Sequence, residues 1–201
     1  GGDMSLWKLL TALYDASNVD DGLWAELAHQ KDNSRFTAQV FEADEGDKLY
    51  RRGLYTFWKR SVPPPNMVAF DAPNREVCVV RRETTNTPLQ ALVLLNDPIF
   101  VEAARGLAQR MLTEAPADDL ERIAYGMQWT TARLPTAEET RLLREELARQ
   151  RGRYTADPEA AAALLAVGPA PRDASLPVVE HAVWTNLATL LLNLDETITK
   201  E

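Results

Sequence analysis

The sequence predicts an all-α protein, a compact multi-helix domain with one long, packed, irregular segment bracketed by prolines at about residues 61–86. Helix-start signals recur through the second half of the chain. Each is a side chain that can cap a helix, followed by proline or by a glutamine or glutamate three residues later. No run of alternating apolar and polar residues is long enough for a sheet strand. Helices are therefore the only regular secondary structure expected.

In the first half of the chain, helical spacing of leucines predicts a helix over residues 5–14, and a short helix is expected around Trp24. Residues 31–46 are polar with little periodicity and are predicted as a loop. Asp47 can cap a helix that runs to about Arg60.

The predicted irregular segment begins at Pro63-Pro64-Pro65, which should end that helix and continue as polyproline II. From Asn66 to Asn86 no period is sustained, yet apolar residues are frequent, so we expect the segment to pack against the body. Cys78, between two valines, is predicted to be buried and inert.

The second half shows the clearest helix signals. Six helices are predicted there: Pro88–Leu95 after the capping box Thr87/Gln90, Pro98 to Leu112 after Asp97, a helix from Asp118 or Asp119, one from the capping box Thr136/Glu139 to about Gln150, an alanine-rich helix from Asp157-Pro158 that Gly168 can end, and about Pro177 to Asn193.

The amino-acid composition excludes several classes of protein and of binding site. With 201 residues, of which 45% are apolar and 26% charged, the chain can bury a core without a disulfide or metal. A single cysteine excludes an internal disulfide, a thiolate zinc site and a Cys-x-x-Cys-His haem attachment in this chain. The two histidines argue against a histidine-based metal centre: His181 is predicted as a satisfied core residue and His29 as solvated. No apolar run is long enough to span a membrane.

Charge is unevenly distributed. The net charge is −8, which argues against nucleic-acid binding, but residues 48–82 carry +6 and the remainder −14. Two explanations stay open: an anion-binding face, or internal pairing of arginines with acidic helices, which we favour. The candidate interaction residues are Arg51, Arg52, Trp58, Lys59, Arg60, Asn74, Arg75, Arg81 and Arg82.

Catalytic motifs are scarce. Asp71 and Glu76 flank a turn and are weak candidates for the acid and base of a two-carboxylate hydrolase. Asp195 and Glu196 follow the last predicted helix, where negative charge is unfavourable to the helix dipole. An arginine of the basic segment is therefore expected to pair with them.

A longer set of motifs adds a resemblance. The motifs are Tyr-Arg-Arg-Gly-Leu-Tyr-Thr-Phe-Trp-Lys-Arg at 50–60, Pro-Pro-Pro-Asn-Met at 63–67, Phe-Asp-Ala-Pro-Asn-Arg-Glu at 70–76, Thr-Asn-Thr-Pro-Leu-Gln-Ala-Leu at 85–92, and Leu-Leu-Asn-Leu-Asp-Glu at 191–196. Together they resemble the planctomycete-type DUF1553 domain, also called PSD1. The resemblance covers residues 48–201, so residues 1–47 are predicted as a separate helical and loop segment. Thr84 stands where the family would have arginine.

The resemblance implies a context more than a chemistry. Such domains lie at the C-terminus of large exported proteins of Planctomycetes and related bacteria, behind a cytochrome-c-like module and a DUF1549 domain, in genomic neighbourhoods of glycan degradation and polysaccharide utilisation. It implies a periplasmic or extracellular location and no settled activity. No cofactor is expected in this chain, and any haem c would belong to another part of the parent protein.

Three functional hypotheses follow. The first is a non-catalytic scaffold or interaction module of the larger, cytochrome-c-associated protein, with that protein's other domains as partners. The second is recognition of an acidic or sulfated polysaccharide by the basic segment. The third is a glycan-acting enzyme that uses Asp71 and Glu76. No signal peptide is visible, and the chain is expected to be a piece of something longer.

Overall fold

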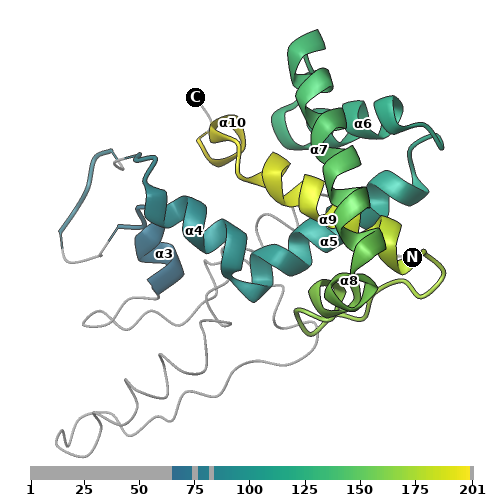
Figure 1. Ribbon diagram of the computed structural model, residues 1–201. Helices are drawn as coiled ribbons and strands as arrows, with labels where there is room; N and C mark the ends of the chain where they lie inside the picture. Colours follow the sequence, from purple (N-terminus) through teal and green to yellow (C-terminus); the bar gives the residue numbers. More distant parts are fainter. Residues whose placement is uncertain (1–64, 74–76, 82–83, 200–201) are drawn as a thin grey trace, which may run out of the picture. The chain divides into compact units, whose positions relative to one another are not determined.

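A computed structural model describes residues 65–73, 77–81 and 84–199. The chain divides into two compact units, Gly1–Thr85 and Asn86–Glu201. All regular structure within the described ranges is helical (Figure 1), so the all-α prediction is confirmed. The predicted elements before residue 65, and the predicted boundary at residue 48, lie outside these ranges.

In the first unit, helix α3 spans Pro65–Ala69. The prediction of irregular or polyproline II chain is therefore wrong here. Pro65 occupies the first helical position, where a missing amide hydrogen costs no hydrogen bond. Met67 is buried, as expected of a packed segment. Residues 77–80 are exposed, so the packing predicted for them and the burial predicted for Cys78 are wrong.

The second unit contains the predicted helices and one more. Their bounds are α4 Pro88–Asn96, α5 Pro98–Thr113, α6 Asp119–Thr131, α7 Ala137–Ala156, α8 Pro158–Leu165, α9 Val178–Leu192 and α10 Asp195–Ile198. Both predicted capping boxes form. The Thr87 side chain accepts from the Gln90 amide at 3.3 Å, and the Gln90 side chain accepts from the Thr87 amide at 2.9 Å.

Two boundaries differ from prediction. Helix α7 continues past Gln150 to Ala156, because nothing interrupts it before Asp157-Pro158. Asp195 and Glu196 open the short helix α10, so they stand in a first turn rather than at an unfavourable helix end.

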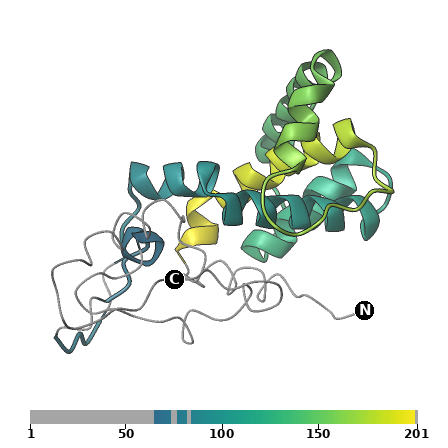
Figure 2. The ribbon, with the colours of Figure 1, turned by 90° about the horizontal axis from the view of Figure 1, so that it is seen from below.

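Helix α9 is the central element of this unit. It lies alongside α5 in both views (Figures 1 and 2) and also packs on α7 and α8. Trp184 and Leu191 of α9 and Leu107 and Met111 of α5 are fully buried. Gly126 lets α6 approach α5 closely, because a Cβ at this position would lie 2.6 Å from the Cε atom of Met111 in α5. None of the described helices is long and apolar enough to cross a membrane.

Candidate functional site

Two of the predicted site residues, Asp71 and Arg81, lie in the described ranges. The others lie outside them, so the structure neither groups nor separates them: Arg51, Arg52, Trp58, Lys59, Arg60, Asn74, Arg75, Glu76 and Arg82. Arg81 is exposed.

Asp71 ends the turn that follows α3. Its backbone is left-handed, with φ of 57°, a conformation that aspartate tolerates better than most residues. Its carboxylate accepts hydrogen bonds from the Thr85 amide at 2.8 Å and from the Thr85 hydroxyl at 2.8 and 3.0 Å. Asp71 thus ties together two parts of the chain that are fourteen residues apart.

Arg133, in the turn between α6 and α7, holds two carboxylates. Its Nη1 and Nη2 donate to Glu139 at 2.9 and 2.7 Å. Its Nε and Nη2 donate to Glu196 at 2.7 and 2.8 Å. The Arg133 hydrogen bonds, with one from the Thr136 backbone, lower the pKa of Glu139 to about 2. The arginine partner expected for Glu196 therefore exists, but it lies outside the basic segment 48–82.

Arg151 of α7 makes a second double contact. Its Nη1 and Nη2 donate to Asp119 at 2.6 and 2.8 Å, and its Nε and Nη2 donate to Glu180 at 2.9 and 3.0 Å. Asp119 and Glu180 stand in the first turns of α6 and α9, where the helix dipole favours negative charge. Hydrogen bonds from Arg151 lower the pKa of Asp119. We call the Arg133 and Arg151 contacts the arginine clasps.

A third cluster joins cations and aromatic rings. Arg110 donates through Nε and Nη2 to Glu114, both at 2.9 Å, and its guanidinium carbon lies 4.0 Å from the ring centre of Trp129. The Tyr125 hydroxyl donates to Glu114. Burial, followed by the Glu114 hydrogen bond, raises the pKa of Tyr125 to about 12. The cluster joins α5 and α6 at the surface.

Comparison with known proteins identifies the family. A family model for PSD1, described as a protein of unknown function (DUF1553), matches residues 12–147. The chain belongs to this family. The PSD1 match begins well before residue 48, where the resemblance was expected to start, and stops within α7, so residues 191–196 lie beyond it. No curated protein and no solved structure matches the chain.

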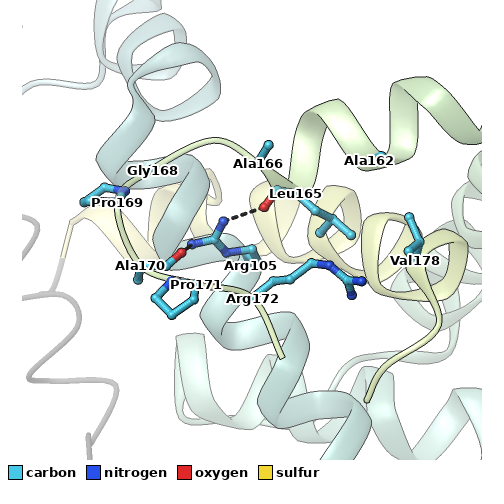
Figure 3. A pocket seen from close by; sticks show the side chains of 10 residues that line it. All are labelled: Arg105, Ala162, Leu165, Ala166, Gly168, Pro169, Ala170, Pro171, Arg172 and Val178. Atoms are coloured by element: carbon cyan, nitrogen blue, oxygen red, sulfur yellow. Dashed lines mark hydrogen bonds between the residues drawn. The ribbon is translucent and has the colours of Figure 1, made fainter. Parts of the chain in front are cut away.

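The second unit contains a pocket (Figure 3), and most of its lining residues follow the end of the PSD1 match at residue 147. Its volume is about 400 Å³. Helix α5 contributes one residue, α8 two, the loop between α8 and α9 six, and α9 one. They are Arg105, Ala162, Leu165, Ala166, Gly168, Pro169, Ala170, Pro171, Arg172 and Val178.

Arg105 holds the loop that forms one wall of the pocket. It is 4% exposed, and its Nη1 donates to the carbonyls of Leu165 and Val167 at 2.6 and 2.8 Å. Its Nη2 donates to the Ala170 carbonyl at 2.5 Å and lies 3.7 Å from Glu102. Arg105 is therefore a structural group whose hydrogen bonds are directed at the loop.

The close approach of the loop to α5 requires a glycine at its bend. Gly168 has φ of +86°, and a Cβ there would lie 2.3 Å from a Glu102 carboxylate oxygen. The same Glu102 carboxylate accepts from the Ala170 amide at 3.0 Å.

Arg172 is the other guanidinium in the pocket. It is half-buried, and its Nη1 donates to the carbonyls of Asp173 and Leu176 at 3.1 and 3.2 Å. Among the described residues, no carboxylate oxygen lies within 4.0 Å of it. Figure 3 shows its side chain extending toward Val178.

His181 is fully buried in α9, as predicted for a core histidine. Burial lowers its pKa, so the ring is neutral near pH 7 and its Nε2 can donate to the Arg105 carbonyl at 3.3 Å. Its Nδ1 has no hydrogen-bond partner in the described part of the chain, so only one of the two ring nitrogens is hydrogen-bonded as predicted. No group of histidine, cysteine, aspartate and glutamate side chains in that part could hold a metal ion.

The arginines of the clasps and of the pocket are not among the residues predicted from the sequence, because the excess of positive charge lies at 48–82. Two sequence features could have indicated them. Residues 86–199 contain arginine but no lysine, which favours forked pairing with carboxylates. The run Gly-Pro-Ala-Pro-Arg-Asp at 168–173 places one arginine in a stiff, proline-rich loop.

Proposed function

We propose that this PSD1 chain is a non-catalytic helical scaffold and interaction module of a larger, exported, haem-associated protein. The observation that carries the proposal is an apolar surface on α4. Leu89, Leu92 and Leu95 are 59, 57 and 44% exposed, while Gln90 and Leu94 of the same helix are buried. Three exposed leucines on a helix of nine residues mark a surface suited to protein contact.

The charges of the second unit support the same proposal, because so many hold the fold together. The arginine clasps connect the starts of α6, α7, α9 and α10, and Arg105 fixes the loop before α9. Helices held in this way offer a partner a surface that needs little ordering on binding. We assign that partner to the other domains of the parent protein.

The two alternatives have unequal support. Exposure of Arg81 favours acidic-polysaccharide recognition, because a cation that binds sulfate or carboxylate must reach solvent. Asp71 is engaged with Thr85, which supports a structural role for its carboxylate rather than acid–base chemistry on a glycan.

Amide hydrogen exchange tests the scaffold proposal. Amides of α4 should exchange more slowly in the parent protein than in the 201-residue chain, because a partner domain covers the leucines. Leu89→Ser with Leu92→Ser should abolish that difference, while Leu142→Ser, an exposed leucine on α7, should preserve it. Equal exchange of α4 in both proteins would overturn the proposal.

A glycan panel tests the alternatives. The Tm of the chain would be measured with neutral, carboxylated and sulfated polysaccharides at low and physiological salt. The same mixtures, kept below the Tm, would be assayed for new reducing ends. The scaffold proposal predicts no shift in Tm and no cleavage. A rise in Tm with sulfated glycans that fades with salt would favour recognition. Cleavage lost in Asp71→Asn would favour the enzyme.

A further inference from the structure

Independently of the scaffold proposal, we propose that the pocket beside Arg105 and Arg172 binds a small organic carboxylate with an apolar body. The Nε and Nη2 groups of Arg172 grip the carboxylate, and the alanine, leucine, proline and valine side chains of the pocket contact the body.

The chain itself shows how this guanidinium edge is used. In Arg110, Arg133 and Arg151, Nε and Nη2 donate in parallel to the two oxygens of one carboxylate, at 2.7 to 3.0 Å. The partners are Glu114, Glu196 and Glu180, each supplied by the fold. Such forked pairs combine two charge-assisted hydrogen bonds and add geometric specificity to the charge attraction.

Arg172 presents the same edge, and no carboxylate of the described residues pairs with it. Its Nη1 is anchored by two backbone carbonyls, which fix the guanidinium in place before any ligand arrives. No hydrogen bond of its Nε or Nη2 to a described residue is found, and neither nitrogen is among the fully buried polar atoms that lack a partner.

Nearby charged groups leave Arg172 available because they are engaged elsewhere. The Asp173 carboxylate accepts from the Ser175 amide at 2.8 Å and from the Ser175 hydroxyl at 2.6 Å, which holds it in its own turn. Glu180 is held by Arg151, and Glu102 accepts from the Ala170 amide. Arg105 donates to the carbonyls of the loop, so Arg172 is the guanidinium left to meet an incoming anion.

The lining defines the rest of the ligand. Apart from the two arginines, its side chains are apolar: an alanine and a leucine of α8, two alanines and two prolines of the loop at 166 and 169–171, and Val178 of α9. A polar or sugar-like body would find few side-chain partners there, while a compact hydrocarbon body would lose water-exposed surface. A volume of about 400 Å³ accommodates a ligand of one ring or a short branched chain.

The test uses the whole chain with 3-phenylpropionate and its uncharged amide, 3-phenylpropionamide, as matched probes. Binding is followed by titration calorimetry and by the ¹H–¹⁵N signals of arginine Nε–H groups. We expect the carboxylate to bind with a dissociation constant on the order of 1 mM or tighter, and the amide at least about tenfold more weakly. The Arg172 Nε–H signal should shift on binding.

Variants locate the site. Arg172→Gln should weaken carboxylate binding at least about tenfold, and Arg172→Lys should weaken it less, because lysine keeps the charge but not the fork. Arg144→Gln, an exposed arginine of α7 outside the lining, should leave binding unchanged. The proposal is overturned by equal binding of the acid and the amide to the wild-type chain, by absence of saturable binding, or by equal effects of the Arg172 and Arg144 changes.

Discussion

Arg151 on α7 and Arg172 in the loop before α9 differ in what their guanidinium groups meet. Arg151 closes on two carboxylates, both of them in the first turns of neighbouring helices. Arg172 meets two backbone carbonyls through Nη1, and its other edge pairs with no carboxylate in the described part of the chain. Both side chains are only partly buried, so burial does not explain the difference.

The difference follows from local structure. A helix start favours an acidic side chain, so α6 and α9 each bring a carboxylate to Arg151. The loop at 166–176 offers Arg172 backbone carbonyls, because five of its eleven residues are prolines or alanines and its one carboxylate, Asp173, is held by Ser175. The same residue type therefore holds the helices together in one region and leaves an anion-binding edge in the other.

The largest expected effect is at Arg105, where the loop carbonyls have a buried partner. Arg105→Ala should lower the free energy of unfolding by about 3 kcal/mol or more, because it leaves buried carbonyls and Glu102 without their cation. Urea unfolding measures it. Arg144→Ala on the exposed face of α7 is the matched control and should change stability by less than about 0.5 kcal/mol. Equal effects of the two changes would contradict the structural role of Arg105.

A smaller loss is expected at the Arg151 clasp. The side chain is 34% exposed, so solvent screens both ion pairs, and Arg151→Ala should cost about 1 kcal/mol. The loss should shrink as salt rises. Arg151→Lys should recover only part of the lost stability, because lysine keeps the positive charge but cannot donate in two parallel forks. A loss as large as that of Arg105→Ala, or one insensitive to salt, would break the comparison.

The Arg133 clasp predicts a pH dependence. The pKa of Glu139 is about 2 in the folded chain, below its ordinary value near 4.5, so the contact stabilises the fold above pH 4.5. As the pH falls from 4.5 toward 2, the unfolded chain takes up a proton before the folded one does, and this stabilisation disappears. Glu139→Gln should flatten the dependence of Tm on pH in that window. Glu159→Gln, at an exposed position of α8, should leave it steep.

The smallest effect on stability is expected at Arg172. Arg172→Gln removes no carboxylate contact with a described residue, so the free energy of unfolding should change by no more than about 0.5 kcal/mol. Binding of 3-phenylpropionate should nevertheless weaken at least about tenfold. A stability loss equal to that of Arg151→Ala would show that Arg172 has a charged partner within the fold.

The helices of the second unit could be predicted because the capping signals at their starts involve residues close together in the sequence. Thr87, Asp97, Asp118, Thr136 and Asp157 each cap within three residues, so the signal and its partner lie together in the sequence. The ends were less accessible: α7 runs beyond Gln150, and α10 had no capping side chain to announce it.

The site could not be predicted in the same way because its contacts are long-range. Arg105 reaches carbonyls sixty or more residues away, and Arg133 pairs with Glu196 across sixty-three. Composition gave an arginine-rich region at 48–82 and an acidic remainder. It could not indicate that clasps would form within the acidic part, because pairing depends on which helix starts meet in space.

Exchange of arginine Nε–H hydrogens with water, measured by NMR on the unliganded chain and after addition of 3-phenylpropionate, tests the comparison most directly. The Nε–H groups of Arg133 and Arg151 should exchange slowly in both samples, because carboxylates of the fold hold them. The Nε–H of Arg172 should exchange fast without ligand and slow down with it. An Arg172 Nε–H as protected as that of Arg151 before ligand is added would contradict the account.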